Sequence, residues 1–491
     1  MLTLKSYINV VSIFLILLVY FSNSVTAQEN IYNYLSLEEA IELSKSNSLE
    51  YKTAKNSSDV GLWTYKSFQS NFYPEISVSG ILPSYNKTIS RITSDDGTDL
   101  FVSQNQAFSS LSVDISQRVY LTGGTFSISS SVNRIDIFSD ENLTTYSTNP
   151  FSISYFQESI FYNPLKWEKK IQPLVYEESK RDLIENIEGI ALNTTSRFFD
   201  FLEAEKKYQN ALQNAKSQDT IYKISKGRFK IGKLYENDLL QSELGLLNAE
   251  KEVINAKNQL KLTKESFLEL IGNKTTNIKL IIPEEVHFIA IDSSELFDKA
   301  LENTVLIIRN KRKVLEAKNE IAKTKRDGIK IGLNGNFGLT NQNNRLGTAY
   351  TNLLDQQTLT LNFSAPIFSW GKRNSQKKIA LANLELIKST NAQELNAAKR
   401  ELSVKYMAWQ QLEISLRVSK KALEISKRRY HVSKRRFAIG KVSITDLNIA
   451  QKEKDSANSN YYRALREYWE LFYEIRKLTL YDFSRGRNVE L

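Results

Sequence analysis

Apolar and polar positions repeat with two different periods along this chain. Residues 35–69 and 294–325 place apolar side chains three and four positions apart, which predicts amphipathic helices. Shorter runs at 111–116 and 358–364 alternate apolar and polar residues almost without error. That alternation predicts strands with one apolar face and one polar face.

Two long charged segments follow the strands, at about 174–229 and 373–437, and no proline occurs in 174–282 or 367–491. Both segments predict helices, and a 60-residue helix is about 90 Å long, far longer than a globular domain needs. Apolar residues spaced for coiled-coil packing recur in the partner of the first long helix and in the second long helix. They are Leu240, Leu244, Leu247, Ile254, Leu412, Leu416 and Leu423.

An internal repeat predicts the overall plan. Residues 222–239 align without gaps on 430–447, with ten of eighteen positions identical. We therefore predict two repeats, 28–283 and 284–491, each with the order helix, strand, strand, helix, tip, helix.

The first repeat carries additional strand signals at about 122–160, where Thr122-Gly123-Gly124-Thr125 indicates a hairpin turn. The sequence leaves open whether this extra hairpin adds two spanning strands or lies outside the membrane. Segments 84–107 and 138–150 are rich in Ser, Thr, Asn and Asp and predict loops.

The N-terminus predicts export from the cytoplasm. Lys5 precedes an apolar run at 8–21, and Val25-Thr26-Ala27 forms a small-residue cleavage site. This pattern is typical of a secretory signal peptide, residues 1–27, cleaved before Gln28. No later segment has the eighteen or so apolar residues that a transmembrane helix requires.

The strands alone fit two environments. A soluble sandwich would show the same alternation as a membrane-spanning sheet. Aromatic residues that cluster where sheet gives way to helix favour the membrane, because aromatic side chains gather at membrane interfaces. These aromatics are Phe161, Tyr162, Trp167, Phe368 and Trp370.

Composition excludes several chemistries. The chain of 491 residues has no cysteine, so disulfides, thiolate catalysis and a cysteine-linked lipoprotein anchor are excluded. His287 and His431 are 144 residues apart and no catalytic or phosphate-binding motif occurs, so we expect neither an enzyme nor a cofactor. The net charge of +11 is spread along helices of an exported chain, which argues against nucleic acid as a partner.

The two tips carry the most specific local motif. Ile231-Gly232-Lys233 and Ile439-Gly440-Lys441 lie where one helix ends and the next begins. Glycine supplies the positive φ of a sharp reversal, and lysine suits a helix C-terminus.

Taken together, the signal peptide, the duplicated plan and the paired tips resemble the TolC-type outer-membrane efflux protein family. The resemblance implies an α+β membrane protein, with long antiparallel coiled-coil helices forming a periplasmic α-barrel. Its strands would contribute to a β-barrel shared by a homotrimer in outer-membrane lipid of a Gram-negative cell. The protein would act as an export channel that receives cargo from a periplasmic adaptor and an inner-membrane pump.

The resemblance also implies roles for the tips. Residues 231–233 and 439–441 match the family's adaptor-contact motif position by position. At the second tip, Phe437 and Asp446 match a periplasmic gate. Ile449 and Val442 replace the second acidic residue and the lock arginine, so we do not expect the family's charged lock here.

The second tip also departs from that family in charge. Lys427-Arg428-Arg429 and Lys434-Arg435-Arg436 recur seven residues apart. A solvated helix face would explain them. The functional alternative is a basic collar, with Arg428, Arg429, Arg435 and Arg436 at its centre, that docks acidic adaptor hairpins or attracts anionic cargo.

A periplasmic coiled-coil adaptor or a stalk without a pore is the alternative to a channel. Adaptors usually carry one helical hairpin between small β-domains, whereas this chain predicts two hairpins together with amphipathic strands. The sequence identifies neither the cargo nor the pump.

Overall fold

The computed structural model describes residues 33–139, 142–272, 278–284, 286, 288–326 and 328–490. The predicted signal peptide and His287 lie outside the described residues. Two compact units contain the chain, and both are discontinuous in sequence: one holds the described residues up to 49 together with 190–288 and 414–470, the other 50–189, 289–413 and 471–491. The boundary predicted between residues 283 and 284 is untested by this division and stays a prediction.

Each helix predicted ahead of the strands is interrupted once. The first consists of α2 (Leu37–Asn47) and α3 (Leu49–Ser70), and the other of α6 (Ser293–Asn303) and α7 (Val305–Arg326). At each break one hydroxyl residue, Ser48 or Thr304, has extended backbone with ψ of 151° or 147°. Periodicity does not reveal a one-residue break, because the apolar spacing continues across it.

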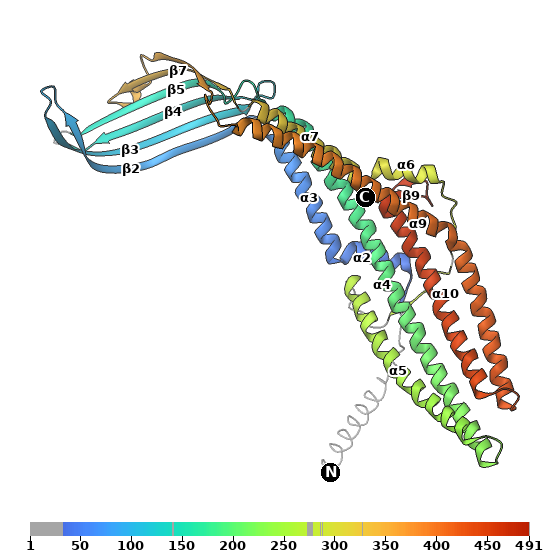
Figure 1. Ribbon diagram of the computed structural model, residues 1–491. Helices are drawn as coiled ribbons and strands as arrows, with labels where there is room; N and C mark the ends of the chain where they lie inside the picture. Colours follow the sequence, from blue (N-terminus) through green and yellow to red (C-terminus); the bar gives the residue numbers. More distant parts are fainter. Residues whose placement is uncertain are drawn as a thin grey trace, which may run out of the picture. The chain divides into compact units, whose positions relative to one another are not determined.

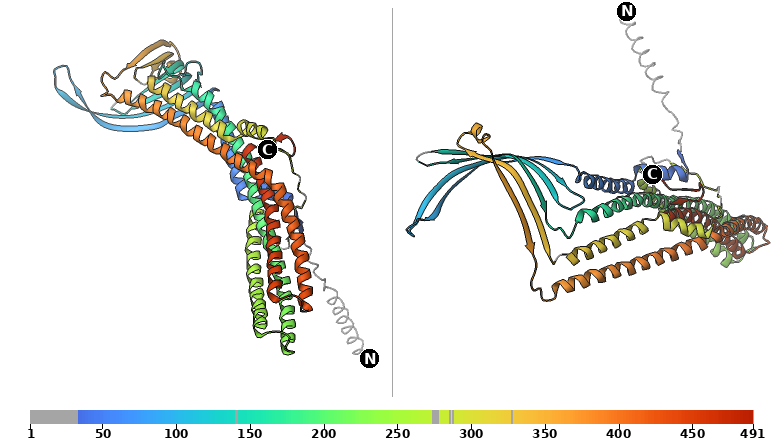
Figure 2. Two further views of the ribbon diagram at one scale, coloured as in Figure 1. Left: turned by 45° about the vertical axis from the view of Figure 1, so that its right-hand side comes forward. Right: turned by 90° about the horizontal axis from the view of Figure 1, so that it is seen from above.

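Four long helices make two hairpins (Figure 1). The first is α4 (Pro164–Lys230) followed by α5 (Glu236–Leu270), and the second is α9 (Lys372–Ala438) followed by α10 (Ile444–Thr479). In the unit that contains the tips, the two hairpins lie side by side (Figure 2). A short parallel pair, β1 (Asn33–Leu35) with β6 (Ile278–Leu280), belongs to the same unit.

Only part of the predicted coiled-coil packing occurs within the chain. Leu412, Leu416 and Leu423 of α9 are buried as predicted. The α5 positions are not buried within the described part of this chain, because Leu240, Leu244, Leu247 and Ile254 are all exposed. Instead α5 buries Ser242, Ala256, Phe267 and Leu270. Heptad spacing identifies an apolar stripe, but it does not say which helix covers the stripe.

One six-stranded antiparallel sheet has the order β2-β3-β4-β5-β7-β8 (Figure 1). Its strands are β2 (Glu75–Thr93), β3 (Asp99–Arg118), β4 (Thr125–Ile137), β5 (Leu143–Gln157), β7 (Lys330–Asn343) and β8 (Leu354–Ser364). A single-turn helix, α8 (Leu346–Ala349), joins β7 to β8. The remaining short pair, β9 (Tyr481–Asp482) with β10 (Arg487–Asn488), lies near the C-terminus.

The extra hairpin lies inside the sheet. β4 pairs with β3 and β5 pairs with β7, so both strands continue one ladder between the two halves of the chain. The loops predicted at 84–107 and 138–150 are therefore wrong over most of their length. β2 and β3 pair along that first segment and turn only at 94–98, so their hairpin extends past the end of β4 (Figures 1 and 2). The polar composition of these segments predicted loops. In the strands, however, the polar residues alternate with Ile, Val and Phe, and this alternation is sufficient for strand pairing.

Buried ion pairs hold the helices of the sheet-containing unit together. The Arg476 guanidinium donates to both carboxylate oxygens of the fully buried Glu188, at 3.0 and 2.9 Å, and to Asp482 Oδ2 at 3.0 Å. Arg312 and Arg309 similarly donate to Glu178, with Nε–O distances of 2.6 and 2.9 Å. Such paired arginines satisfy carboxylates that would otherwise be costly to bury.

Candidate functional site

The two hairpin tips have the same backbone geometry. Gly232 and Gly440 have φ of +68° and +76°, the left-handed region that glycine adopts without strain. The Gly232 N–H donates to Phe229 O and the Lys233 N–H to Arg228 O, both at 2.9 Å. The second tip repeats the arrangement from Gly440 to Phe437 O and from Lys441 to Arg436 O, also at 2.9 Å. Both helices thus end in a Schellman motif, as the glycine positions predicted.

The first residue of each tip motif presents its side chain to solvent. Ile231 and Ile439 are 66% and 67% exposed. Isoleucine at the outermost point of a helical hairpin contributes nothing to the core of the chain.

The two predicted gate residues lie in different environments. Phe437 is 2% exposed and packs in a cluster with Ile221, Tyr430, Ile444 and Leu447, which joins α4, α9 and α10. Asp446 is exposed in the first turn of α10, where the Ser443 hydroxyl donates to its carboxylate at 2.7 Å and its N–H donates to Ser443 Oγ at 3.0 Å. Ser443 therefore caps α10, and Asp446, the third residue of the helix, supports this cap.

A contact between the tips was not predicted. The Arg228 guanidinium of the first hairpin reaches the second, where its Nη1 donates to Phe437 O at 3.4 Å. A Cβ placed on Gly440 would lie 2.5 Å from Arg228 Nη2. Lys434 adds a second link by donating to Ser217 Oγ at 3.0 Å. Neither link has a sequence signal, because each joins residues more than 200 positions apart.

The basic collar occupies the last turns of α9. Arg428, Arg429, Arg435 and Arg436 are all exposed. Arg429 pairs with Glu453 of α10. Between residues 427 and 441 the chain has seven Lys and Arg and no acidic residue, so the second tip carries a strong positive charge.

The sheet has two chemically distinct faces. On one face the rows across the strands are apolar, for example Ile76, Ile115, Ile128, Ile153 and Phe337, which are paired in register. On the other face the neighbouring row consists of Ser77, Asp114, Ser129, Ser152 and Gly338. Ser79 and Ser112 share a hydrogen bond of 2.7 Å on this face, and Ser152 donates to Asn336 at 2.8 Å.

The apolar face lies open in the chain. Ile76 and Val78 of β2 and Leu359, Leu361 and Phe363 of β8 are each at least two-thirds exposed. A second sheet packed on this face, as in a sandwich, would have buried them. An exposed apolar face opposite a hydroxyl-rich face is the arrangement of a sheet between lipid and water.

The predicted interface aromatics divide into two groups. Phe161, Phe368 and Trp370 are exposed, and the rings of the latter two meet edge to face with centroids 4.4 Å apart. Tyr162 turns inward and donates to Asn319 Oδ1 at 2.7 Å. Trp167 lies half-buried in α4, with Lys170 over its ring.

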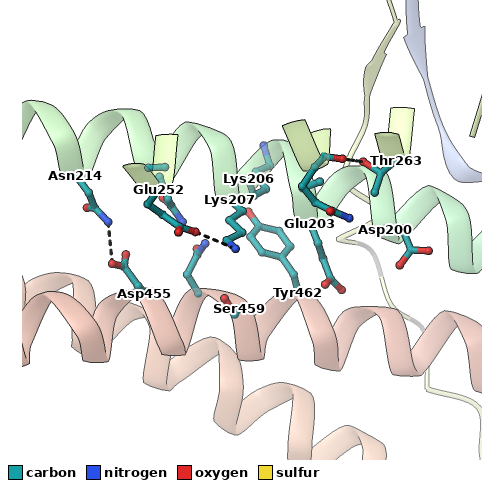
Figure 3. Close-up of a pocket in the computed structure, with 15 residues that line it drawn as sticks. Asp200, Glu203, Lys206, Lys207, Asn214, Glu252, Thr263, Asp455, Ser459 and Tyr462 are labelled. Carbon is teal, nitrogen blue, oxygen red and sulfur yellow. Dashed lines mark hydrogen bonds and ion pairs between the residues drawn. The ribbon is translucent and has the colours of Figure 1, made fainter. Parts of the chain in front are cut away.

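A polar groove of about 500 Å³ lies between α4, α5 and α10 (Figure 3). Lys207 pairs with Glu252 at 2.9 Å and Asn214 donates to Asp455 Oδ2 at 2.8 Å along its walls. Burial raises the pKa of Glu203, although Arg466 nearby opposes the shift. The residues that line the groove come from three distant segments of the chain, so their spacing in the sequence did not predict the groove.

Within the described residues, no cluster of acidic or histidine side chains has the arrangement of a metal site. In that same part of the chain, none of the helices has an uncharged apolar stretch long enough to cross a lipid bilayer.

Part of the chain matches a known family, and the whole chain resembles solved structures. Residues 300–479 match the family described as outer membrane efflux protein. The chain is similar to the CmeC outer membrane channel of Campylobacter jejuni, with 16% identity and a TM-score of 0.67 over 94% of this chain and 87% of that one. Against the MtrE outer membrane channel of Neisseria gonorrhoeae the identity is 14% and the TM-score 0.63, with 93% and 91% covered.

The outer membrane protein VceC of Vibrio cholerae has the same fold, with 12% identity, a TM-score of 0.59 and coverage of 92% and 97%. A search of curated protein sequences found no match. Residues 300–479 are therefore similar to the outer membrane efflux protein family, and the chain as a whole has the fold of these channels. The resemblance inferred from the sequence is confirmed.

Proposed function

We propose that this chain is one protomer of an outer-membrane export channel. Three copies form a duct that passes cargo from a periplasmic adaptor and an inner-membrane pump to the outside. The exposed apolar face of the sheet carries this proposal, because neither an adaptor nor a stalk needs one. The match of residues 300–479 to the efflux protein family supports the same class of function.

In this proposal the sheet is the membrane wall and the helical hairpins extend into the periplasm. The apolar rows face lipid, and the rows of Ser, Thr and Asn face the water-filled interior. Phe161, Phe368 and Trp370 lie at the helical side of the sheet, where aromatic side chains would meet the lipid headgroups. Transport requires no covalent chemistry, so the chain supplies a path while the pump supplies the energy.

The tips are the proposed adaptor contact. Ile231 and Ile439 offer exposed apolar side chains, and Lys233 and Lys441 add charge at the same two turns. The basic collar next to them favours an adaptor whose hairpin ends are acidic, since complementary charge accelerates docking and fixes its orientation.

The first experiment combines fractionation with conductance. The mature protein should fractionate with outer membranes as an SDS-labile trimer, and planar bilayers containing it should show small, mostly closed conductance. A monomer that stays in the soluble fraction and inserts into no bilayer would overturn the proposal in favour of an adaptor or stalk.

Charge reversal tests the collar. Arg435→Glu with Arg436→Glu should weaken adaptor capture and lower efflux, and added salt should weaken the wild-type interaction in the same direction. Arg417→Glu with Lys420→Glu is the matched control, because both residues are exposed basic positions earlier on α9 and farther from the tip. Equal capture by both double variants would refute a specific role for the collar.

A further inference from the structure

The six-stranded sheet meets the helices at one end, and basic side chains gather there (Figure 1). Among the described residues, eleven exposed Lys and Arg lie on the first two turns of α4 and α9, the last turn of α7 and the first position of β7. We call this set the junction belt. It consists of Lys166, Lys169, Lys170, Lys323, Lys325, Arg326, Lys330, Lys372, Arg373, Lys377 and Lys378.

The junction belt carries a large excess of positive charge. Glu158, Glu168 and Glu320 lie in the same segments, and the sequence adds Asp327. Eleven cations against four acidic residues give a net charge of +7. Apart from Lys330, no member of the belt forms an ion pair with another described residue. The charges therefore repel one another in the isolated chain.

The opposite end of the sheet has the reverse charge. The turn between β2 and β3 carries Asp95, Asp96 and Asp99 and neither Lys nor Arg. The connection from β4 to β5 carries Asp140 and Glu141, again without a basic residue. A general need for solubility would place cations at both ends. Their excess at the helical end alone indicates a partner specific to that end.

The belt begins just beyond the exposed aromatic side chains. Phe161 precedes α4 by three residues, and Phe368 and Trp370 precede α9 by four and two residues. At about 1.5 Å per residue, the basic positions of each helix lie within about 10 Å of its sheet-side end. The polar layer on each side of a bilayer is about 5–8 Å thick. If the sheet is the membrane wall, the belt therefore lies at the depth of the lipid headgroups.

Contacts between the helix ends make the belt one surface. The Tyr162 hydroxyl, just before α4, donates to Asn319 Oδ1 of α7 at 2.7 Å. The Arg373 guanidinium of α9 lies against Gly328, so close that a Cβ at that position would overlap it. The cations of α4, α7 and α9 are thus held beside one another, although the sequence separates them.

A cavity of about 380 Å³ opens within the belt, between the start of α4 and the end of α7. Lys323, Arg326 and Lys330 line it together with Glu158 and Glu320. Lys and Arg bind phosphate oxygens, whereas carboxylates accept hydrogen bonds from hydroxyl groups. A headgroup made of phosphate and glycerol needs both kinds of partner, and this cavity offers both.

We propose that the junction belt binds anionic phospholipid headgroups of the periplasmic leaflet, with phosphatidylglycerol as the ligand. Basic clusters next to membrane-spanning segments attract anionic lipids in this way. The inference rests on the proposed function, because it needs the sheet to lie in the membrane, and it adds a lipid site to that function. Bound headgroups would neutralise the repulsion within the belt and fix the depth of the sheet in the bilayer.

Lipid binding in detergent tests the site. The purified mature protein in dodecyl maltoside is titrated with phosphatidylglycerol or with phosphatidylethanolamine, and native mass spectrometry counts the bound lipids. The wild type should prefer phosphatidylglycerol, and added salt should weaken that binding because ions screen the belt. The triple variant Lys323→Gln, Arg326→Gln and Lys372→Gln should bind phosphatidylglycerol at least about tenfold more weakly.

The matched control combines Lys311→Gln, Lys399→Gln and Arg400→Gln. These side chains are also exposed, carry the same total charge and lie on the same two helices, α7 and α9. Each is at least fifteen residues from the sheet-side end of its helix, about 22 Å by helix rise and beyond the headgroup layer. The control should keep its affinity for phosphatidylglycerol within about twofold of wild type.

Four outcomes decide the matter. Weaker phosphatidylglycerol binding in the belt variant alone supports the lipid site. Equal binding of the two lipids by the wild type, or equal loss in both variants, overturns the site, while a conducting trimer leaves the export function standing. Displacement of the lipid by an equal concentration of free glycerol phosphate overturns lipid as the occupant in favour of a soluble anion. A soluble monomer that inserts into no bilayer overturns the export function and the lipid site with it.

Discussion

Truncation of Phe437 tests what holds the two tips together. Its ring is 2% exposed and fills the cluster formed with Ile221, Tyr430, Ile444 and Leu447. Phe437→Ala removes a buried aromatic side chain, which costs about 3–5 kcal/mol when the surroundings do not collapse. Since 1.4 kcal/mol corresponds to a factor of ten in an equilibrium constant, the local opening equilibrium of the tips should rise by about two to three and a half orders of magnitude.

Hydrogen exchange measures that equilibrium directly. Amides of residues 221–230 and 437–447 should exchange faster by the same factor in Phe437→Ala, while amides of the sheet keep their wild-type rates. Bilayer recordings of the variant should show longer open times if tip separation opens the duct.

Ile439→Ala is the matched control, because this neighbouring side chain is 67% exposed and its removal should cost less than about 0.5 kcal/mol. It should lower adaptor capture without changing exchange. Unaltered exchange at the tips of Phe437→Ala would refute the view that this cluster joins the hairpins.

Three further predictions concern stability and assembly. Arg476→Met leaves the carboxylate of Glu188 buried without its cation and leaves Asp482 only the more distant Arg485, so the variant should lose about 3–5 kcal/mol in denaturant unfolding, and a loss below about 1 kcal/mol would contradict the ion-pair account. Leu247→Glu changes an exposed residue of α5, so it should lower the fraction of trimer in detergent with little change in the secondary structure or melting of the monomer; unchanged trimer would show that the exposed leucines of α5 do not lie between copies. Burial raises the pKa of Glu203, so the folded chain binds this proton more tightly than the unfolded chain and loses stability as pH rises from about 4 through the raised pKa; Glu203→Gln should therefore raise the melting temperature at pH 7 and not at pH 4, and an equal shift at both would exclude this titration as the cause.

Local chemistry was sufficient to predict the tips. A glycine after a long proline-free charged run determines where the helix ends, and both Gly232 and Gly440 end their helices as expected. The strands at 111–116 and 358–364 were also predicted, because alternation of apolar and polar residues depends only on nearest neighbours.

Long-range features escaped prediction for a common reason. The pairing of β2 with β3 beyond residue 82, the groove beside Glu203 and the contact from Arg228 to Phe437 each depend on segments that the sequence separates. The one-residue breaks at Ser48 and Thr304 escaped because each helix resumes with its apolar spacing intact.

The exposure of the apolar stripe on α5 was unexpected for a different reason. That reason also explains how the sequence of this chain favours assembly. Leu240, Leu244 and Leu247 have the spacing of coiled-coil positions, yet no helix among the described residues covers them. The same holds for Leu359 and Leu361 on β8, whose apolar face and open edge have no partner within the described residues. A chain that leaves these surfaces exposed gains their burial free energy only from lipid and from other copies, so its stability depends on protomer concentration and on insertion. Mutations at these positions should therefore act on assembly, whereas those at Phe437 or Arg476 act on the fold of the single chain.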